Sequence, residues 1–206
     1  MRLSFSKTKL YSLIYEIFSS DIGPGVNILY CSRWTLRRVD KAFNIETNGV
    51  YCSPRPGGDI LFPKRKGRST ICIYKGLPNY VECNTLLHEY GHHLCFSRKC
   101  KCLRQRQRHG SEFHALKYTL KELLTRKWHS PLFHEMTLVC TYLSRSDNYL
   151  YHASRRLIRD PIWKKCEELF GDELRKWMYN QYGIAKYAMP EFAEAQGEFE
   201  NIPLLD

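Results

Sequence analysis

One segment of the chain, residues 86–94, sets a histidine-glutamate motif within an apolar run. His88, Glu89 and His92 together make the pattern H-E-x-x-H. In a helix, His88 and His92 lie one turn apart on the same face and can bind the same ion. Glu89 follows the first histidine, so its carboxylate can flank the metal and accept a proton from water. The segment therefore predicts a buried helix that carries a zinc site of the hydrolytic kind.

The length and composition are those of one globular domain, with 206 residues of which 43% are hydrophobic. No run approaches the roughly 18 to 20 apolar residues that cross a bilayer. Residues 10–18 have the periodicity of an amphipathic helix and differ from a secretory signal. The 9 cysteines, without an export signal, indicate reduced thiols. We therefore expect a soluble intracellular protein, cytoplasmic or associated with the nucleoid or nucleus, with no membrane partner.

The net charge of +11 is unevenly distributed, because residues 190–206 contain acidic residues and no Lys or Arg. The rest of the chain is thus more basic than the total indicates. A basic surface favours acidic partners, of which nucleic acid is the commonest. DNA is therefore an expected partner beside a protein or peptide substrate, whereas the oligomeric state has no signature in the sequence.

Hydrophobic periodicity and turn signals predict an α+β fold. Its small mixed sheet, packed with helices, precedes a helical C-terminal extension. We expect a domain over residues 1–125, the extension over 126–189 and a loosely ordered acidic tail over 190–206. Strands are expected at residues 26–31, 50–52, 59–62 and 70–74, the last three as a meander. Helices are expected at residues 10–18, 32–43, 80–96, 109–124, 132–143, 148–158, 161–170 and 172–182, with Gly171 separating the last two.

A basic run follows the motif and links it to the next predicted helix. Its cationic residues are Arg98, Lys99, Lys101, Arg104, Arg106 and Arg108. Because the run joins two segments that carry candidate metal ligands, it must lie near the mouth of the site. It can be a solvated loop, a contact for nucleic acid, or a contact for an acidic peptide.

A catalytic zinc ion has three protein ligands and one open position. The motif supplies two of them, and His109 and Glu112, both at the start of the next predicted helix, are candidates for the third. The donor that stabilises an oxyanion has three candidates among the neighbouring side chains, His93, His114 and Tyr118.

The motif, followed by His109-Gly110-x-x-Phe113, resembles the SprT-like zinc metallopeptidases, the family of the Spartan and Wss1 proteases. The resemblance covers residues 50–124. It implies a zincin-like minimal metallopeptidase domain in which His88, His92 and His109 bind Zn²⁺ and Glu89 is the general base. It also implies hydrolysis of peptide bonds in DNA-associated proteins. The four-cysteine zinc ribbon of many bacterial members is missing, because the chain has no C-x-x-C pair.

A second resemblance is to the ImmA/IrrE-like peptidases, which carry H-E-x-G-H and a later glutamate followed three residues on by alanine. Gly91, Glu112 and Ala115 match that pattern. It implies that Glu112 is the third ligand and that the substrate is a repressor. We expect His109 as the ligand, because H-G-x-x-F is the more particular pattern. A different class of function is a basic nucleic-acid-binding protein with a structural or vestigial zinc site.

Three cysteines, Cys95, Cys100 and Cys102, lie between the motif and the next helix. They can form a second metal site or a redox site, or they can be free thiols. Their spacing differs from that of usual zinc sites, so we expect free thiols.

Overall fold

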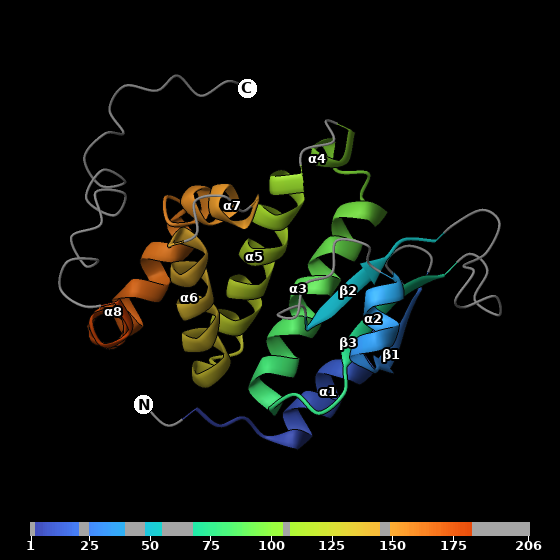
Figure 1. Ribbon diagram of the computed structural model, residues 1–206, viewed down its shortest axis with the longest axis horizontal. Helices are drawn as coiled ribbons and strands as arrows, with labels where there is room; N and C mark the ends of the chain where they lie inside the picture. Colours follow the sequence, from blue (N-terminus) through green and yellow to red (C-terminus); the bar gives the residue numbers. More distant parts are fainter. Residues whose placement is uncertain are drawn as a thin grey trace.

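The computed structural model describes residues 3–20, 25–39, 48–54, 68–104, 108–144 and 149–182, without the side chains of residues 37, 39, 103, 104, 108, 109, 149 and 182. The described chain is an α+β structure in which a small mixed sheet packs with helices (Figure 1). The predicted strand at residues 59–62 and the acidic tail lie outside the described residues.

The sheet has three strands in the order β1-β3-β2, and their bounds are β1 Val26–Cys31, β2 Gly49–Cys52 and β3 Ser69–Tyr74. β1 runs parallel to β3, and β2 runs antiparallel to it. The central strand β3 is buried along most of its length, in keeping with its place between β1 and β2. Two helices accompany the sheet, α1 Lys7–Phe18 and α2 Arg33–Val39. α1 buries Leu10, Leu13 and Ile17, the face that its periodicity predicts.

The motif helix, α3 Asn79–Ser97, lies between the sheet and the remaining helices (Figure 1). Pro78 stands at its N-cap, and Glu82 in the first turn complements the positive end of the helix dipole. Because α3 has neighbours on both sides, most of its residues from Glu82 to Cys95 are buried. The predicted burial of the helix that carries the motif is confirmed.

The helices after α3 are α4 Lys101–Arg104, α5 Arg108–Thr125, α6 His129–Leu143, α7 Tyr149–Leu157 and α8 Pro161–Tyr182. Buried side chains from α1, the sheet, α3 and the helices α5 to α8 make one apolar cluster. The predicted C-terminal helices therefore pack on the same core as the sheet and α3. The boundary at residue 125 itself stays a prediction.

The predicted break at Gly171 is wrong, because α8 continues through it as one helix. An apolar stripe runs past the glycine on both sides: Trp163, Cys166, Phe170, Leu174 and Met178 are all buried. Their helical spacing means that burial of the stripe outweighs the roughly 1 kcal/mol by which glycine disfavours a helix. Among the described helices, none is long and apolar enough to cross a membrane.

Candidate metal centre

The two motif histidines face each other across one turn of α3. His88 Nε2 lies 3.2 Å from His92 Nε2, and the rings are nearly perpendicular, with centroids 4.8 Å apart. Both side chains are half-buried. The helix therefore places two imidazole nitrogens beside each other, as the H-E-x-x-H spacing predicts.

A carboxylate from α5 completes the group. Glu112 Oε2 lies 3.0 Å from His88 Nε2 and 3.4 Å from His92 Nε2. One ligand atom from each of the three residues lies within 4.8 Å of the other two. The structure thus brings together His88, His92 and Glu112, which we call the metal triad.

The three separations fit a tetrahedral ion. With metal-nitrogen and metal-oxygen bonds of about 2.0 to 2.1 Å, two ligand atoms of a tetrahedral site lie about 3.3 to 3.4 Å apart. The observed distances of 3.0, 3.2 and 3.4 Å are close to that value. Zinc accepts imidazole and carboxylate ligands in this number and leaves a fourth position open. The donor set and its geometry therefore suit a catalytic zinc ion.

Electrostatics within the metal triad favour a cation. Burial acts to raise the pKa of Glu112, but the charges and hydrogen bonds of His92 and His88 outweigh it and hold that pKa well below its ordinary value. Burial acts to lower the pKa of His88, but Glu112 raises it to about 9. The ionised carboxylate thus holds a proton on His88, at the place where a metal ion would supply positive charge.

Glu89 is buried beside the metal triad and beneath strand β2. A Cβ atom at Gly49 would overlap Thr85 and come within 3.2 Å of Glu89 Cγ, so the strand needs glycine to approach this closely. Burial raises the pKa of Glu89, although His88, His92 and a hydrogen bond from the Tyr51 amide act in the opposite direction. A carboxylate with a raised pKa is a suitable general base near neutral pH.

Two further residues act on the motif histidines, and the sequence did not reveal either of them. Ser111 Oγ lies 2.7 Å from His92 Nδ1, the ring nitrogen that faces away from the metal triad. On α6, the fully buried Glu135 accepts a 2.8 Å hydrogen bond from Asn84 and acts electrostatically on His88. Such outer contacts fix the orientation of ligating histidines. Glu135 could have been noticed in the sequence, because it is a charged residue within the apolar run of α6.

The other predicted third ligand, His109, belongs to the first turn of α5, and its side chain is outside the described residues. Its role stays a prediction. Of the predicted nucleic-acid-binding residues, Arg98, Lys99 and Lys101 are exposed next to the C-terminal end of α3. The side chains of Arg104, Arg106 and Arg108 are outside the described residues.

The candidates for an oxyanion donor have other contacts. His93 is buried beneath the sheet, with Ser69 Oγ 3.1 Å from its Nδ1 and Ser97 Oγ 3.3 Å from its Nε2. The ring of Tyr118 packs against Tyr90 at 5.9 Å. His114 lies with the cysteines that follow the motif.

Those cysteines form a second group that can hold a metal ion, made of Cys95, Cys100, Cys102 and His114. We call it the cysteine cluster. Its donor atoms also lie within 4.8 Å of one another. The 9 cysteines are all in the described part of the chain, and no two of them form a disulfide. None of the three cysteines is in a disulfide, as expected of free thiols, but they converge on one histidine, which their spacing did not predict.

Comparisons of the chain with models of protein families, with curated proteins and with solved structures give no match.

Proposed function

We propose that the protein is a zinc-dependent metallopeptidase. The observation that supports this most strongly is the meeting of His88, His92 and Glu112 at tetrahedral distances, with the buried Glu89 beside them. Two histidines and a carboxylate with a neighbouring glutamate are the donor set of hydrolytic zinc sites.

Glu112 is the better supported third ligand. Its Oε2 is in contact with both motif histidines, and α5 holds it there within a buried helix pair. This favours the pattern H-E-x-G-H with a later E-x-x-A, as in the ImmA/IrrE-like peptidases, over the SprT-like pattern. The SprT-like resemblance implies His109 as the ligand instead. The experiment that tests Glu112 as a ligand also tests His109.

The metal triad and the residues around it have different roles in the proposed hydrolysis. Zinc held by the metal triad would supply a Lewis acid that polarises both a water molecule and the scissile carbonyl. Glu89 accepts the proton from the water and passes it to the leaving amine. Ser111 keeps the His92 ring in the orientation in which its Nε2 faces His88 and Glu112.

Strand β2 supports a peptide as the substrate. Among the described strands it pairs only with β3, so it stands at the edge of the sheet, and its Gly49 and Tyr51 adjoin Glu89. A sheet edge can pair with an extended peptide through main-chain hydrogen bonds. A peptide bound in this way would lie beside the general base.

DNA-associated proteins are the proposed substrates. Arg98, Lys99 and Lys101 are exposed at the end of α3 that follows the metal triad, and they support an anionic partner at that end. A protease with such a surface would cut more efficiently when its substrate is bound to the same nucleic acid.

The test compares the wild-type chain with Glu89→Gln on a library of peptides, with zinc content measured by inductively coupled plasma mass spectrometry. The isosteric amide cannot accept a proton, so cleavage should fall by at least about 100-fold. Zinc content should stay unchanged, because Glu89 is no ligand. Glu168→Gln, at an exposed position of α8, is the matched control and should retain full activity.

Equal cleavage by wild type and Glu89→Gln would exclude the mechanism. Absence of cleavage by the zinc-loaded wild type, together with salt-dependent binding of DNA, would instead favour a nucleic-acid-binding protein with a structural zinc site.

A further inference from the structure

The cysteine cluster is built by the way in which α3 ends. Lys99 has a φ of +51° and the chain reverses there. The amide of Cys100 donates to the carbonyl of Cys95 at 3.0 Å, and the amide of Lys99 donates to that of Phe96 at 3.0 Å. This pair of hydrogen bonds is the Schellman motif, which brings together the side chains five residues apart. Cys95 and Cys100 therefore meet because of the helix end.

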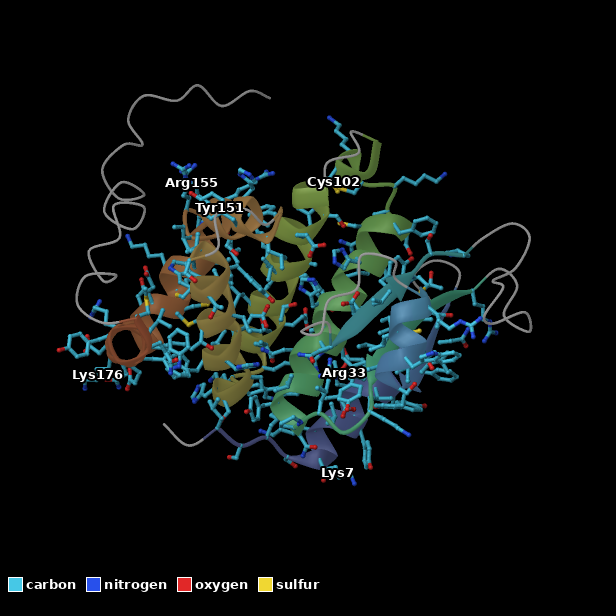
Figure 2. The ribbon with its side chains drawn as sticks, viewed as in Figure 1. Lys7, Arg33, Cys102, Tyr151, Arg155 and Lys176 are labelled. Carbon is cyan, nitrogen blue, oxygen red and sulfur yellow. The ribbon has the colours of Figure 1, made fainter. Side chains whose placement is uncertain are left out.

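Two more elements supply the remaining donors. Cys102 comes from the short helix α4, at the end of the molecule where α3 and α5 approach it (Figure 2). His114 comes from α5, and its Nδ1 lies 3.3 Å from the Sγ atoms of both Cys95 and Cys100 and 3.7 Å from that of Cys102. The Sγ atoms of Cys100 and Cys102 are 3.1 Å apart. Three separate parts of the chain thus converge on a small volume.

The separations are close to those of a tetrahedral zinc site. With zinc-sulfur bonds of about 2.3 Å and zinc-nitrogen bonds of about 2.0 to 2.1 Å, sulfur and nitrogen lie about 3.6 Å apart and two sulfurs about 3.8 Å. The three sulfur-nitrogen distances are within about 0.3 Å of that value. The Sγ atoms of Cys100 and Cys102, 3.1 Å apart, would need to separate by about 0.7 Å.

The surroundings also suit such an ion. Cys95 and Cys102 are buried, and Cys100 and His114 are half-buried, so the donors are at least partly shielded from competing water. Three thiolates and one neutral imidazole around Zn²⁺ carry a net negative charge. Arg156 and Lys117 lie near enough to act electrostatically on His114, and their positive charge favours that anionic site.

We infer that Cys95, Cys100, Cys102 and His114 bind a second zinc ion, which is structural. A set of four protein ligands leaves no open position for a substrate, in contrast to the metal triad. Binding releases the three thiol protons and joins the end of α3 to α4 and α5. The ion would hold in place the connection between the two helices that carry the metal triad, and it would do so whether or not the protein is a peptidase.

The test uses Co²⁺ as a spectroscopic substitute for zinc, in the full chain with His88→Ala and His92→Ala so that the metal triad cannot bind. We expect one Co²⁺ per chain and a thiolate-to-cobalt charge-transfer band in the near ultraviolet. Adding either Cys100→Ser or Cys102→Ser should abolish the band or lower its intensity by at least about one third, because one of the three thiolates is lost. Cys52→Ser, which changes a cysteine of similar exposure in β2, should retain it.

A second measurement covers the case in which a cysteine variant does not fold. In the wild-type chain, Zn²⁺ should protect Cys100 from alkylation by iodoacetamide, and a chelator should restore the reaction. The inference is overturned if the cobalt complex shows no thiolate band, if the band keeps its full intensity in Cys100→Ser and Cys102→Ser, or if Zn²⁺ leaves the alkylation unchanged. A disulfide between two of the three cysteines, detected by mass in the chain purified without oxidant, overturns it as well.

Discussion

Gly91 of α3 packs directly on Ala115 of α5, with no space for a side chain between the helices. A Cβ atom at Gly91 would lie 2.8 Å from the Cα atom and 3.3 Å from the Cβ atom of Ala115. Both residues lie close in sequence to the metal triad, Gly91 beside His92 and Ala115 three residues after Glu112. The close approach of the two backbones allows the side chain of Glu112 to reach both histidines.

Gly91→Ala should separate the helices and weaken the metal triad. The added methyl group meets backbone atoms, so relief requires movement of α5, and we expect a loss of about 1 to 3 kcal/mol in the free energy of unfolding. Zinc affinity at the metal triad should fall as well, measured by competition with a chelator. The control is Gly171→Ala in α8, where the new Cβ has only ordinary contacts. That variant should be more stable than wild type by up to about 1 kcal/mol. Equal effects of the two substitutions would contradict the close packing.

Glu112→Ala should remove one zinc ion per chain, since it deletes a ligand of the metal triad. His109→Ala should retain full zinc content if Glu112 is the third ligand. Both are measured as zinc content per chain after dialysis. Loss of zinc in His109→Ala alone would identify the histidine as the ligand and favour the SprT-like resemblance.

Ser111→Ala should weaken zinc binding by about 10 to 100-fold, the usual effect of removing an outer partner of a ligating histidine. The 2.7 Å contact with His92 Nδ1 fixes which ring nitrogen is available for the ion. Ser97→Ala is the matched control, because Ser97 contacts His93, a histidine of the same helix outside the metal triad. An unchanged zinc affinity in Ser111→Ala would show that the serine has no orienting role.

His134 should make the fold sensitive to acid. It is partly buried against the Tyr80 ring, and burial lowers its pKa to about 4 from the ordinary 6.5. The folded state therefore binds this proton less readily than the unfolded state. The stability from the neutral ring is present above pH 6.5 and is lost as the pH falls to about 4, by at most about 3 kcal/mol.

His134→Phe should remove that contribution, so its free energy of unfolding should change less than that of wild type between pH 7 and pH 4. Denaturant titrations at a series of pH values measure the difference. His129→Phe, at an exposed position of the same helix, should follow the wild-type curve. A wild-type pH dependence in His134→Phe would show that another group carries the effect.

Local patterns were enough to predict most elements of the fold. The amphipathic spacing in α1, the apolar run of β3 and the H-E-x-x-H segment each specify an element through contacts between residues near in sequence. The parallel pairing of β1 with β3 could not be read in this way, because it joins strands separated by α2 and β2. Gly171 was misleading, since its cost in a helix is smaller than the gain from the stripe that surrounds it.

The sequence by itself determined two members of the metal triad and the adjacent glutamate, because His88, Glu89 and His92 belong to one helix and their geometry follows from its pitch. Only the tertiary structure placed Glu112 against them, through the close packing of Gly91 on Ala115. The cysteine cluster was equally inaccessible to sequence spacing. It depends on the left-handed conformation of Lys99, a position where the sequence has no glycine to indicate such a turn. It also depends on the docking of α4 and α5 against the end of α3. Contacts within a helix follow from sequence order, whereas contacts between helices depend on how closely and at what rotation they pack.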